Sequence, residues 1–322
     1  MTTGGNGRFA ALLALINPFL SEGTWLRCAL HAHTTRSDGE LQPESLADHY
    51  ARAEWNALAV TDHWTITEPP TRPDMVLLRG IELTCRTASG GWVDVLVYGL
   101  ERELDVDPDD ERTYPDLPDA MAFVAEHGGV AYVAHPYWSG APMNEIAPLE
   151  AVVGIEVWNA GCELENGRGL STVHWDMLLD AGRTTFAVAC DDTHYAGFDS
   201  GYAWTMARAA EATPAALLEA LRTGACYGST GPRLDAVEPV AGGVLVRCSP
   251  CRSVTLLTGP EDGCRANTGR LAYLQRARIV DRDPAGLITA VRFDPPPGAA
   301  AGRVELADGD GRTAWSNPIP LG

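Results

Sequence analysis

The sequence predicts an α/β protein in which a (β/α) barrel of about seven strands precedes a small all-β domain. Three observations support this fold class. Short apolar runs alternate with helix-like segments, polar residues close several of these runs, and helical periodicity disappears after Pro232. Such runs are typical of strands buried on both faces, and their alternation with helices indicates parallel pairing through right-handed crossovers.

The expected barrel occupies residues 25–235. The first predicted helix begins with proline and acidic residues, and the later ones end next to glycine, which are typical helix boundaries. The strands are predicted at residues 25–30, 57–61, 75–78, 129–134 and 186–190, and the helices at 43–55, 117–127, 171–181 and 214–222.

Two further parts flank the barrel. Residues 1–24 are expected to form a Gly-rich tail and a helix that packs on the barrel. The apolar run 9–20 resembles a secretory segment, but Asn17-Pro18 interrupts it and no A-x-A-like cleavage site follows. Residues 236–322 are expected to form the β domain, with a hairpin turn at Asp310-Gly311. Its β-like runs cover residues 244–247, 254–257, 271–280, 288–293 and 304–306.

Residues 101–116 form an acidic, proline-bearing segment inside the barrel region. We interpret this segment as a solvated surface loop, and a lid near the functional site is the alternative. Its acidic residues between positions 105 and 111 are Asp105, Asp107, Asp109, Asp110 and Glu111.

The segment 31–39 places two imidazoles and a carboxylate directly after the first apolar run. In an extended segment residues i and i+2 point the same way, so His31 and His33 can face one point. Asp38 can return to that point after a turn. Imidazole suits zinc, iron and manganese, and a carboxylate suits hard divalent cations. The segment therefore predicts a metal site.

Further polar residues close other apolar runs, which is the pattern of a (β/α) barrel site at the carboxyl ends of strands. Eight candidate ligands are too many for one ion, so two or three divalent ions (manganese, zinc or iron) are expected. The candidate ligands are His31, His33, Asp38, His63, Glu82, His135, Asp192 and His194.

These motifs resemble the metal-binding motifs of the PHP (polymerase and histidinol phosphatase) family in order and spacing across residues 25–233. Residues 191–194 and 227–232 resemble one branch, the CehA/McbA-like metal-dependent phosphoesterases. The resemblance implies a distorted (β/α)7 barrel. The motifs are His31-x-His33, Ser37-Asp38-Gly39, Asp62-His63, Gly80-Ile81-Glu82, His135-Pro136 and Asp192-x-His194.

The resemblance also implies how the ligands divide among the ions. Glu82 would bridge two ions. One of these ions would be completed by His31, His33 and Asp192, and its neighbour would be held by His135. A third ion would be held by Asp38, His63 and His194.

Four residues are candidates for a catalytic role. Asp192 and His194 are candidates in addition to their role as ligands. Arg36 is one of four arginines that could face the substrate, the others being Arg79, Arg168 and Arg233. Asn159 either reaches the site or caps a strand end. Asp62 and Asp191 adjoin ligands, so we expect them to orient the neighbouring histidines. Histidines 49, 127 and 174 are expected to have structural or surface roles.

The composition limits the possible partners. A net charge of −19 argues against a nucleic-acid polymer. No apolar run approaches the ~20 residues needed to cross a bilayer, so no membrane partner is expected. The eight scattered cysteines, several of them in apolar runs, fit a reducing compartment and a cytoplasmic location. The expected partner is a small molecule, and the oligomeric state is left open.

The leading functional hypothesis is a phosphoesterase that acts on a small phosphorylated molecule or nucleotide through a metal-bound hydroxide. The alternatives are a metal-dependent hydrolase of a carboxylic ester or carbamate, and a non-catalytic metal-binding accessory module. Because all candidate ligands precede residue 195, we expect residues 1–235 to retain the metals without the β domain.

Overall fold

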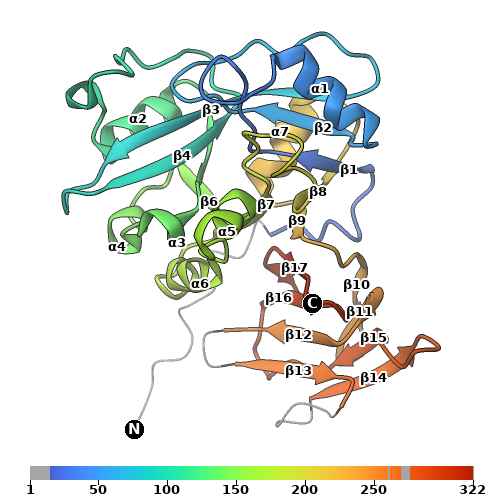
Figure 1. Cartoon of the computed structure of the whole chain (residues 1–322). Helices are drawn as coiled ribbons and strands as arrows, with labels where there is room; N and C mark the ends of the chain where they lie inside the picture. The colour runs from blue at the N-terminus through green and yellow to red at the C-terminus, as the bar shows by residue number, and fades with distance from the viewer. Residues whose placement is uncertain (1–14, 260–261, 270–275, 322) are drawn as a thin grey trace, which may run out of the picture.

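The computed structural model describes residues 15–259, 262–269 and 276–321 and shows a helix-covered region joined to a smaller all-β region (Figure 1). None of the helices in these residues has the length and apolar character needed to cross a bilayer. The helices are α1 (Pro43–Arg52), α2 (Leu117–Glu126), α3 (Pro136–Ser139), α4 (Met143–Ile146), α5 (Ala160–Asn166), α6 (Thr172–Asp180), α7 (Pro214–Thr223) and the 3₁₀ helix η2 (Glu111–Thr113).

The first seven strands lie side by side in chain order. Strands β1, β2 and β3 are parallel to one another, and so are β5, β6 and β7. A parallel bridge between Ala32 and Thr193 joins the end of β7 to the end of β1, so the strand order closes on itself at this end. The strands are β1 (Thr24–Ala29), β2 (Ala57–Val60), β3 (Val76–Arg86), β4 (Trp92–Tyr98), β5 (Val130–Val133), β6 (Val152–Asn159) and β7 (Phe186–Cys190).

Strand β4 departs from the expected (β/α)7 barrel, which is not confirmed. It runs antiparallel to both β3 and β5. Only residues 87–91 connect β3 to β4, whereas a parallel crossover needs a dozen or more residues. Gly90 adopts a φ of 87° in this connection, which suits a tight turn. The coil between β2 and β3 also lacks the helix of a regular barrel unit.

Alternate residues of the strands enter two apolar clusters, as the two-residue period of a strand requires. Tyr98 and Tyr132 join a cluster that includes α7, and the Tyr132 hydroxyl donates to the Leu221 carbonyl at 2.7 Å. Val97 and Val133, one residue away, join the cluster that includes α2 and α6. Both faces of the central strands are therefore buried.

The described residues after Pro232 form strands and no helix, as the sequence predicts, and residues 271–275 of the predicted run 271–280 lie outside the described residues. They contribute a four-stranded antiparallel sheet, β10-β11-β15-β14. The later strands are β8 (Trp204–Ala209), β9 (Cys226–Ser229), β10 (Leu234–Val240), β11 (Gly243–Cys251), β12 (Ser253–Leu257), β13 (Gly263–Asn267), β14 (Ala277–Arg282), β15 (Ile288–Phe293), β16 (Ala301–Ala307), β17 (Thr313–Ser316) and β18 (Ile319–Pro320).

The C-terminal strands are continuous with the sheet of the helix-covered region. Strand β17 pairs with β9, which pairs with β8, and β8 pairs with β1. The ring of Trp315 stacks on Trp158 of β6, with 6.1 Å between the ring centroids. The side chain of Asn317 accepts from the Ala187 amide of β7 at 2.6 Å. A domain boundary at residue 235 remains a prediction.

The N-terminal helix predicted at residues 9–20 falls partly outside the described residues, which begin at Leu15. Residues 15–23 form turns and not a helix. Asn17 precedes a proline, which disfavours the helical conformation. Its side chain accepts from the Phe19 amide at 3.0 Å and donates to the Val237 carbonyl at 2.9 Å. This segment therefore packs on the β region through a turn.

Candidate metal centre

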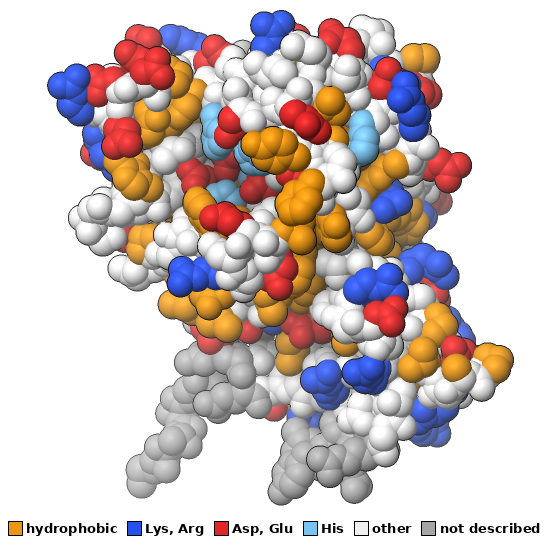
Figure 2. Space-filling view, viewed as in Figure 1, with side chains coloured by type: hydrophobic (Ala, Val, Ile, Leu, Met, Phe, Trp, Pro, Cys, Tyr) orange, Lys and Arg blue, Asp and Glu red, His pale blue; other side chains and the backbone are white. Residues whose placement is uncertain are grey.

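The eight predicted ligands converge beside the carboxyl ends of β1, β2, β5 and β7; Glu82 itself lies within the longer strand β3, where it forms a β-bridge with His63 after the end of β2. The pairs His31/His33 and Asp192/His194 directly follow the parallel strands β1 and β7, and His63 and His135 follow β2 and β5. Figure 2 shows histidine and acidic side chains gathered in a hollow of the helix-covered region, with apolar side chains around it. Three donor sets have ligand atoms within 4.8 Å of one another: His31/His33/Glu82/Asp192, His33/Asp38/His63/His194 and Glu82/Asp94/His135.

Glu82 lies at the centre of this arrangement and is almost completely buried. Its Oε2 lies 3.0 Å from Nε2 of His31 and 3.2 Å from Nε2 of His33. Its Oε1 lies 3.2 Å from Nε2 of His135. Since its two oxygens face different histidines, Glu82 belongs to two donor sets, as a bridging carboxylate must.

Asp192, which follows the carboxyl end of β7, faces the same two histidines. Its Oδ1 lies 3.1 Å from Nε2 of His31 and 3.3 Å from Nε2 of His33. Within the described residues neither this oxygen nor His33 Nε2 has a hydrogen bond of good geometry, although both atoms are buried. Buried polar atoms rarely lack partners, and a cation between them would satisfy both. The donor set therefore fits a divalent ion.

The set of Asp38, His63 and His194 is more open to solvent. Nε2 of His194 lies 3.4 Å from Oδ2 of Asp38, and Nε2 of His63 lies 3.7 Å from the same oxygen. The Asp38 side chain is 53% exposed, so a ligand can approach this set from solvent. A Cβ at Gly39 would lie 2.3 Å from the His33 carbonyl oxygen, so this turn requires glycine.

The mutual charges of the site shift its pKa values. Burial alone would lower the pKa of His33, but the carboxylates of Asp192 and Glu82 outweigh burial and raise the pKa to about 9. The pKa of His135 is likewise raised to about 9, against burial, by Glu82. Burial would raise the pKa of Glu82, but the charges of His31 and His63 hold it well below its usual range. The imidazoles of His33 and His135 therefore favour a bound proton next to these carboxylates, at nitrogens where a divalent cation would bind instead.

Two carboxylates of the centre were missed by sequence reasoning. Asp94 joins Glu82 and His135 in a donor set, but it lies within β4, an antiparallel strand that was not among the predicted strands. Glu156 lies in the apolar run of β6 and is fully buried. An acidic residue inside an apolar run was the available signal for both, because burial of an unpaired carboxylate is unfavourable.

Glu156 holds the ligands in place. It accepts from Nδ1 of His31 at 2.7 Å, from the His135 amide at 2.8 Å and from the Asn159 side chain at 2.9 Å. This contact fixes the His31 tautomer that directs Nε2 toward Glu82. Asn159 also donates to Oδ2 of Asp192 at 3.1 Å and caps α5 by accepting from the Cys162 amide. Asn159 thus caps a helix and contacts a candidate ligand, and its catalytic role remains a prediction.

Asp62 and Asp191 fix the loops that carry the ligands. Asp62 accepts from the amide of Thr34 at 2.6 Å and from the hydroxyl of Ser37 at 2.7 Å. Asp191 accepts from three successive amides, those of residues 201–203, at 2.7–2.9 Å. The two carboxylates orient loops and do not contact the histidine rings through these bonds.

The backbone is strained at the centre. Of the described non-glycine residues, four have a positive φ, and three of them belong to or adjoin the centre: Trp64 (62°), His135 (27°) and Asp192 (59°). Such conformations are unfavourable for L-residues and concentrate at functional sites. Here they turn the chain sharply where strands end, which directs the side chains inward.

The four candidate arginines have different environments. Arg36 is exposed, lines the cavity beside Asp38, and forms no ion pair within the described residues. Arg168 lies over the ring of Tyr137, 5.6 Å from its centroid. Arg79 pairs with Glu68, and Arg233 pairs with Asp235. Of these four arginines, Arg36 lies next to the donor sets without an ion pair in the described part of the chain.

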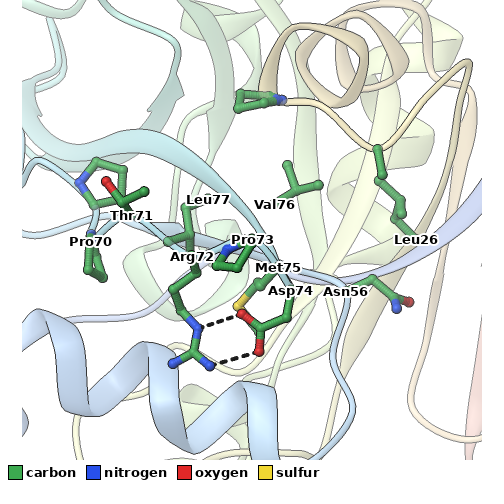
Figure 3. Close-up of a pocket in the computed structure, with 13 residues that line it drawn as sticks. Leu26, Asn56, Pro70, Thr71, Arg72, Pro73, Asp74, Met75, Val76 and Leu77 are labelled. Carbon is green, nitrogen blue, oxygen red and sulfur yellow. Dashed lines mark hydrogen bonds and ion pairs between the residues drawn. The ribbon is translucent and has the colours of Figure 1, made fainter.

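Another cavity, of about 450 Å³, lies at the opposite, amino-terminal ends of β1–β3 (Figure 3). Its arginine, Arg72, is bound by Asp74 at 2.8 Å and by Asp48. None of the predicted ligands lines it. Of these two cavities, the one beside Asp38 is therefore the one that the predicted ligands line.

The fold is similar to that of a two-domain protein from Bacteroides vulgatus that contains a predicted PHP-like metal-dependent phosphoesterase. The TM-score is 0.51 at 17% identity, over 92% of this chain and 96% of that chain. An amidohydrolase from Chromobacterium violaceum matches at 18% identity (TM-score 0.39, 53% and 89% of the chains). A proposed metal-dependent phosphoesterase from Bifidobacterium adolescentis matches at 17% identity (TM-score 0.42, 54% and 90%). No family model and no curated protein matches the sequence.

We expect Glu156→Gln to weaken divalent-metal affinity by about 10–100-fold, because the amide can offer its N–H₂ toward His31 Nδ1 and release the tautomer. Calorimetric titration of metal into the chelator-treated protein measures this affinity. Glu163→Gln is the matched control, since Glu163 accepts from the Gly169 amide on the adjoining loop and belongs to no donor set. Unchanged affinity in Glu156→Gln would remove Glu156 from the ligand support.

Proposed function

We propose that this chain is a PHP-type metal-dependent phosphoesterase that hydrolyses a small phosphorylated molecule or nucleotide with two or three divalent ions. The observation that supports this most is the sharing of donors: Glu82 and His33 each belong to two of the three donor sets. A carboxylate shared by two sets, as Glu82 is, would place neighbouring cations within a few ångströms, which suits the several oxygens of a phosphate ester. His33, with one lone-pair nitrogen as a neutral imidazole, would serve one ion. The CehA/McbA-like branch remains part of the proposal.

Divalent cations bound here would supply Lewis acidity toward phosphate oxygens and a nucleophilic water at neutral pH. The residues of this chain position that chemistry. Glu156 and Asn159 hold His31 and Asp192, so the donors need little rearrangement when a ligand binds. The exposed guanidinium of Arg36 can pair with phosphate oxygens at the open side of the centre.

Asp192 and His194 are the proposed catalytic residues that also bind metal. Nδ1 of His194 lies 3.6 Å from Oδ1 of Asp192, while its Nε2 faces Asp38. His194 therefore links the buried donor set to the open one.

The positive charge of Arg36 at the cavity would favour a phosphate ester over a neutral carbonyl substrate. A carbamate or carboxylic ester carries no charge that needs Arg36, whereas a phosphate ester does. We therefore expect Arg36→Ala to raise KM for phosphate esters by about tenfold, with a smaller change in kcat. Arg52→Ala is the control, since Arg52 is an exposed arginine on α1 outside the cavity.

Manganese-loaded protein is expected to hydrolyse phosphate esters, and chelation is expected to abolish this activity, because every donor set requires a cation to act. A panel of phosphomonoesters, phosphodiesters, nucleotides, carboxylic esters and carbamates, with elemental analysis of bound metal, tests both points. Turnover of a carbamate or ester alone would favour the other hydrolase. Metal binding without turnover of any substrate would favour an accessory module.

A further inference from the structure

A cavity of about 460 Å³ opens directly beside the exposed donor set. Its volume lies within the range of small-molecule sites. One side carries the metal donors Asp38 and His63, and the other side carries aromatic and hydroxyl groups. The lining residues are Arg36, Ser37, Asp38, His63, Trp64, Thr65, Thr84, Pro108 and Tyr114.

Trp64 and Tyr114 form the aromatic wall of this cavity. Their ring centroids lie 4.5 Å apart at 39°. Trp92 packs edge-on against Tyr114 at 5.6 Å, and the Tyr114 hydroxyl donates to the Pro108 carbonyl at 2.8 Å. The Tyr114 ring is thus held from two directions while it remains partly exposed. A fixed, partly exposed aromatic face is suited to stacking with a planar ligand group.

The wall is positioned relative to the donors by the backbone. Trp64 follows the ligand His63, and its amide donates to the Glu82 carbonyl at 3.1 Å. Its φ of 62° is unfavourable for a tryptophan, so the surrounding structure enforces this position. Trp64 therefore connects the cavity wall to two ligand-bearing strands.

The acidic segment 101–116 supplies the rest of the wall, through Pro108 and Tyr114. The segment is ordered by its own contacts: Asp110 caps η2, and the Thr113 hydroxyl donates to the Asp107 carbonyl at 3.0 Å. Arg86 of β3 pairs with Asp116 at 3.0 Å. The segment is thus a surface loop, and two of its residues border the cavity.

We propose that this cavity binds a planar aromatic group of the substrate, such as an aryl or heteroaryl group attached to the phosphate, with Tyr114 as the specificity-determining residue. The inference rests on the proposed function, since the phosphate would sit at the adjacent donors. The hydroxyls of Thr65 and Thr84 and the guanidinium of Arg36 would face polar substituents of that group. A substrate without a ring would leave the wall uncovered and bind less tightly.

Two probes that differ in their organic group test this directly: phenylphosphonate and methylphosphonate, titrated calorimetrically into the manganese-loaded full-length protein at a pH where both are dianions. We expect phenylphosphonate to bind about tenfold more tightly. In Tyr114→Ala the two affinities should differ by less than about twofold, whereas Tyr114→Phe, which keeps the ring, should retain the preference. If Tyr114→Ala does not fold, Tyr114→Leu serves in its place.

The outcomes separate this inference from the proposed function. Equal affinities in the unaltered protein, or binding of neither probe, overturn the aromatic site. A preference that survives in Tyr114→Ala, or in Tyr114→Leu where that variant replaces it, also overturns it. Because phosphonates are not hydrolysed, a ring preference that depends on Tyr114 supports the inference even if no phosphate ester is turned over. Turnover of phosphate esters without a ring preference supports the function alone.

Discussion

Glu82→Ala is expected to reduce kcat for phosphate-ester hydrolysis by about a thousandfold, or about 4 kcal/mol in activation free energy. The physical reason is that Glu82 belongs to two donor sets, and His31, His33 and His135 all lie within 3.2 Å of its oxygens. Its removal would leave these imidazoles without their shared carboxylate. Steady-state kinetics at saturating manganese, with elemental analysis of the bound metal, measures the effect.

His63→Ala provides the comparison within the centre. His63 belongs to one donor set and is 32% exposed, so we expect a loss of about tenfold. His49→Ala is the outer control, since His49 contacts Ser200 and belongs to no donor set of the described residues. Equal losses in Glu82→Ala and His63→Ala would contradict the bridging role of Glu82.

Removal of residues 236–322 is expected to prevent the rest of the chain from folding. The ligands all precede residue 195, and this order by itself predicts a self-sufficient barrel; the structure gives the opposite expectation. Asn317 accepts from Ala187 and donates to the carbonyls of Gly224 and Cys226, so the C-terminal segment satisfies buried groups of β7 and β9. A protein comprising residues 1–235 should therefore lack a cooperative thermal transition, measured by circular dichroism.

A point variant tests the same contact in the full chain. Asn317→Ala leaves one buried amide and two buried carbonyls without this partner, and we expect it to lower the free energy of unfolding by about 3–5 kcal/mol. Asp310→Ala is the control, because its exposed pair with Arg312 contributes little. Cooperative folding and full metal binding by residues 1–235 would show that the C-terminal strands are dispensable.

Much of the candidate site could be predicted from the sequence because of where parallel strands end. Parallel strands bring their carboxyl ends to one edge, so polar residues that close apolar runs must lie near one another. The structure brings all eight candidate ligands together on this basis. Arg36 and Asn159 could be named but not placed, because the sequence does not show where a long or capping side chain is directed.

Asp94 and Glu156 could not be predicted from polar residues that close apolar runs. Both lie within apolar runs and not after them, and only the packing of β4, β5 and β6 reveals that they face His135 and His31. A carboxylate inside an apolar run signals an unusual contact, but the residue that compensates its burial comes from another strand.

The sequence by itself determined the ligand types, their order, the positions of the main helices and the change to β structure after Pro232. These features depend on local periodicity, turn residues and chain order, which are properties of neighbouring residues. Only the tertiary structure decided the reversed β4, the pairing of β17 with β9, and the aromatic wall beside Asp38. These features depend on contacts between residues far apart in the chain. Local sequence patterns do not report the free energies of such contacts.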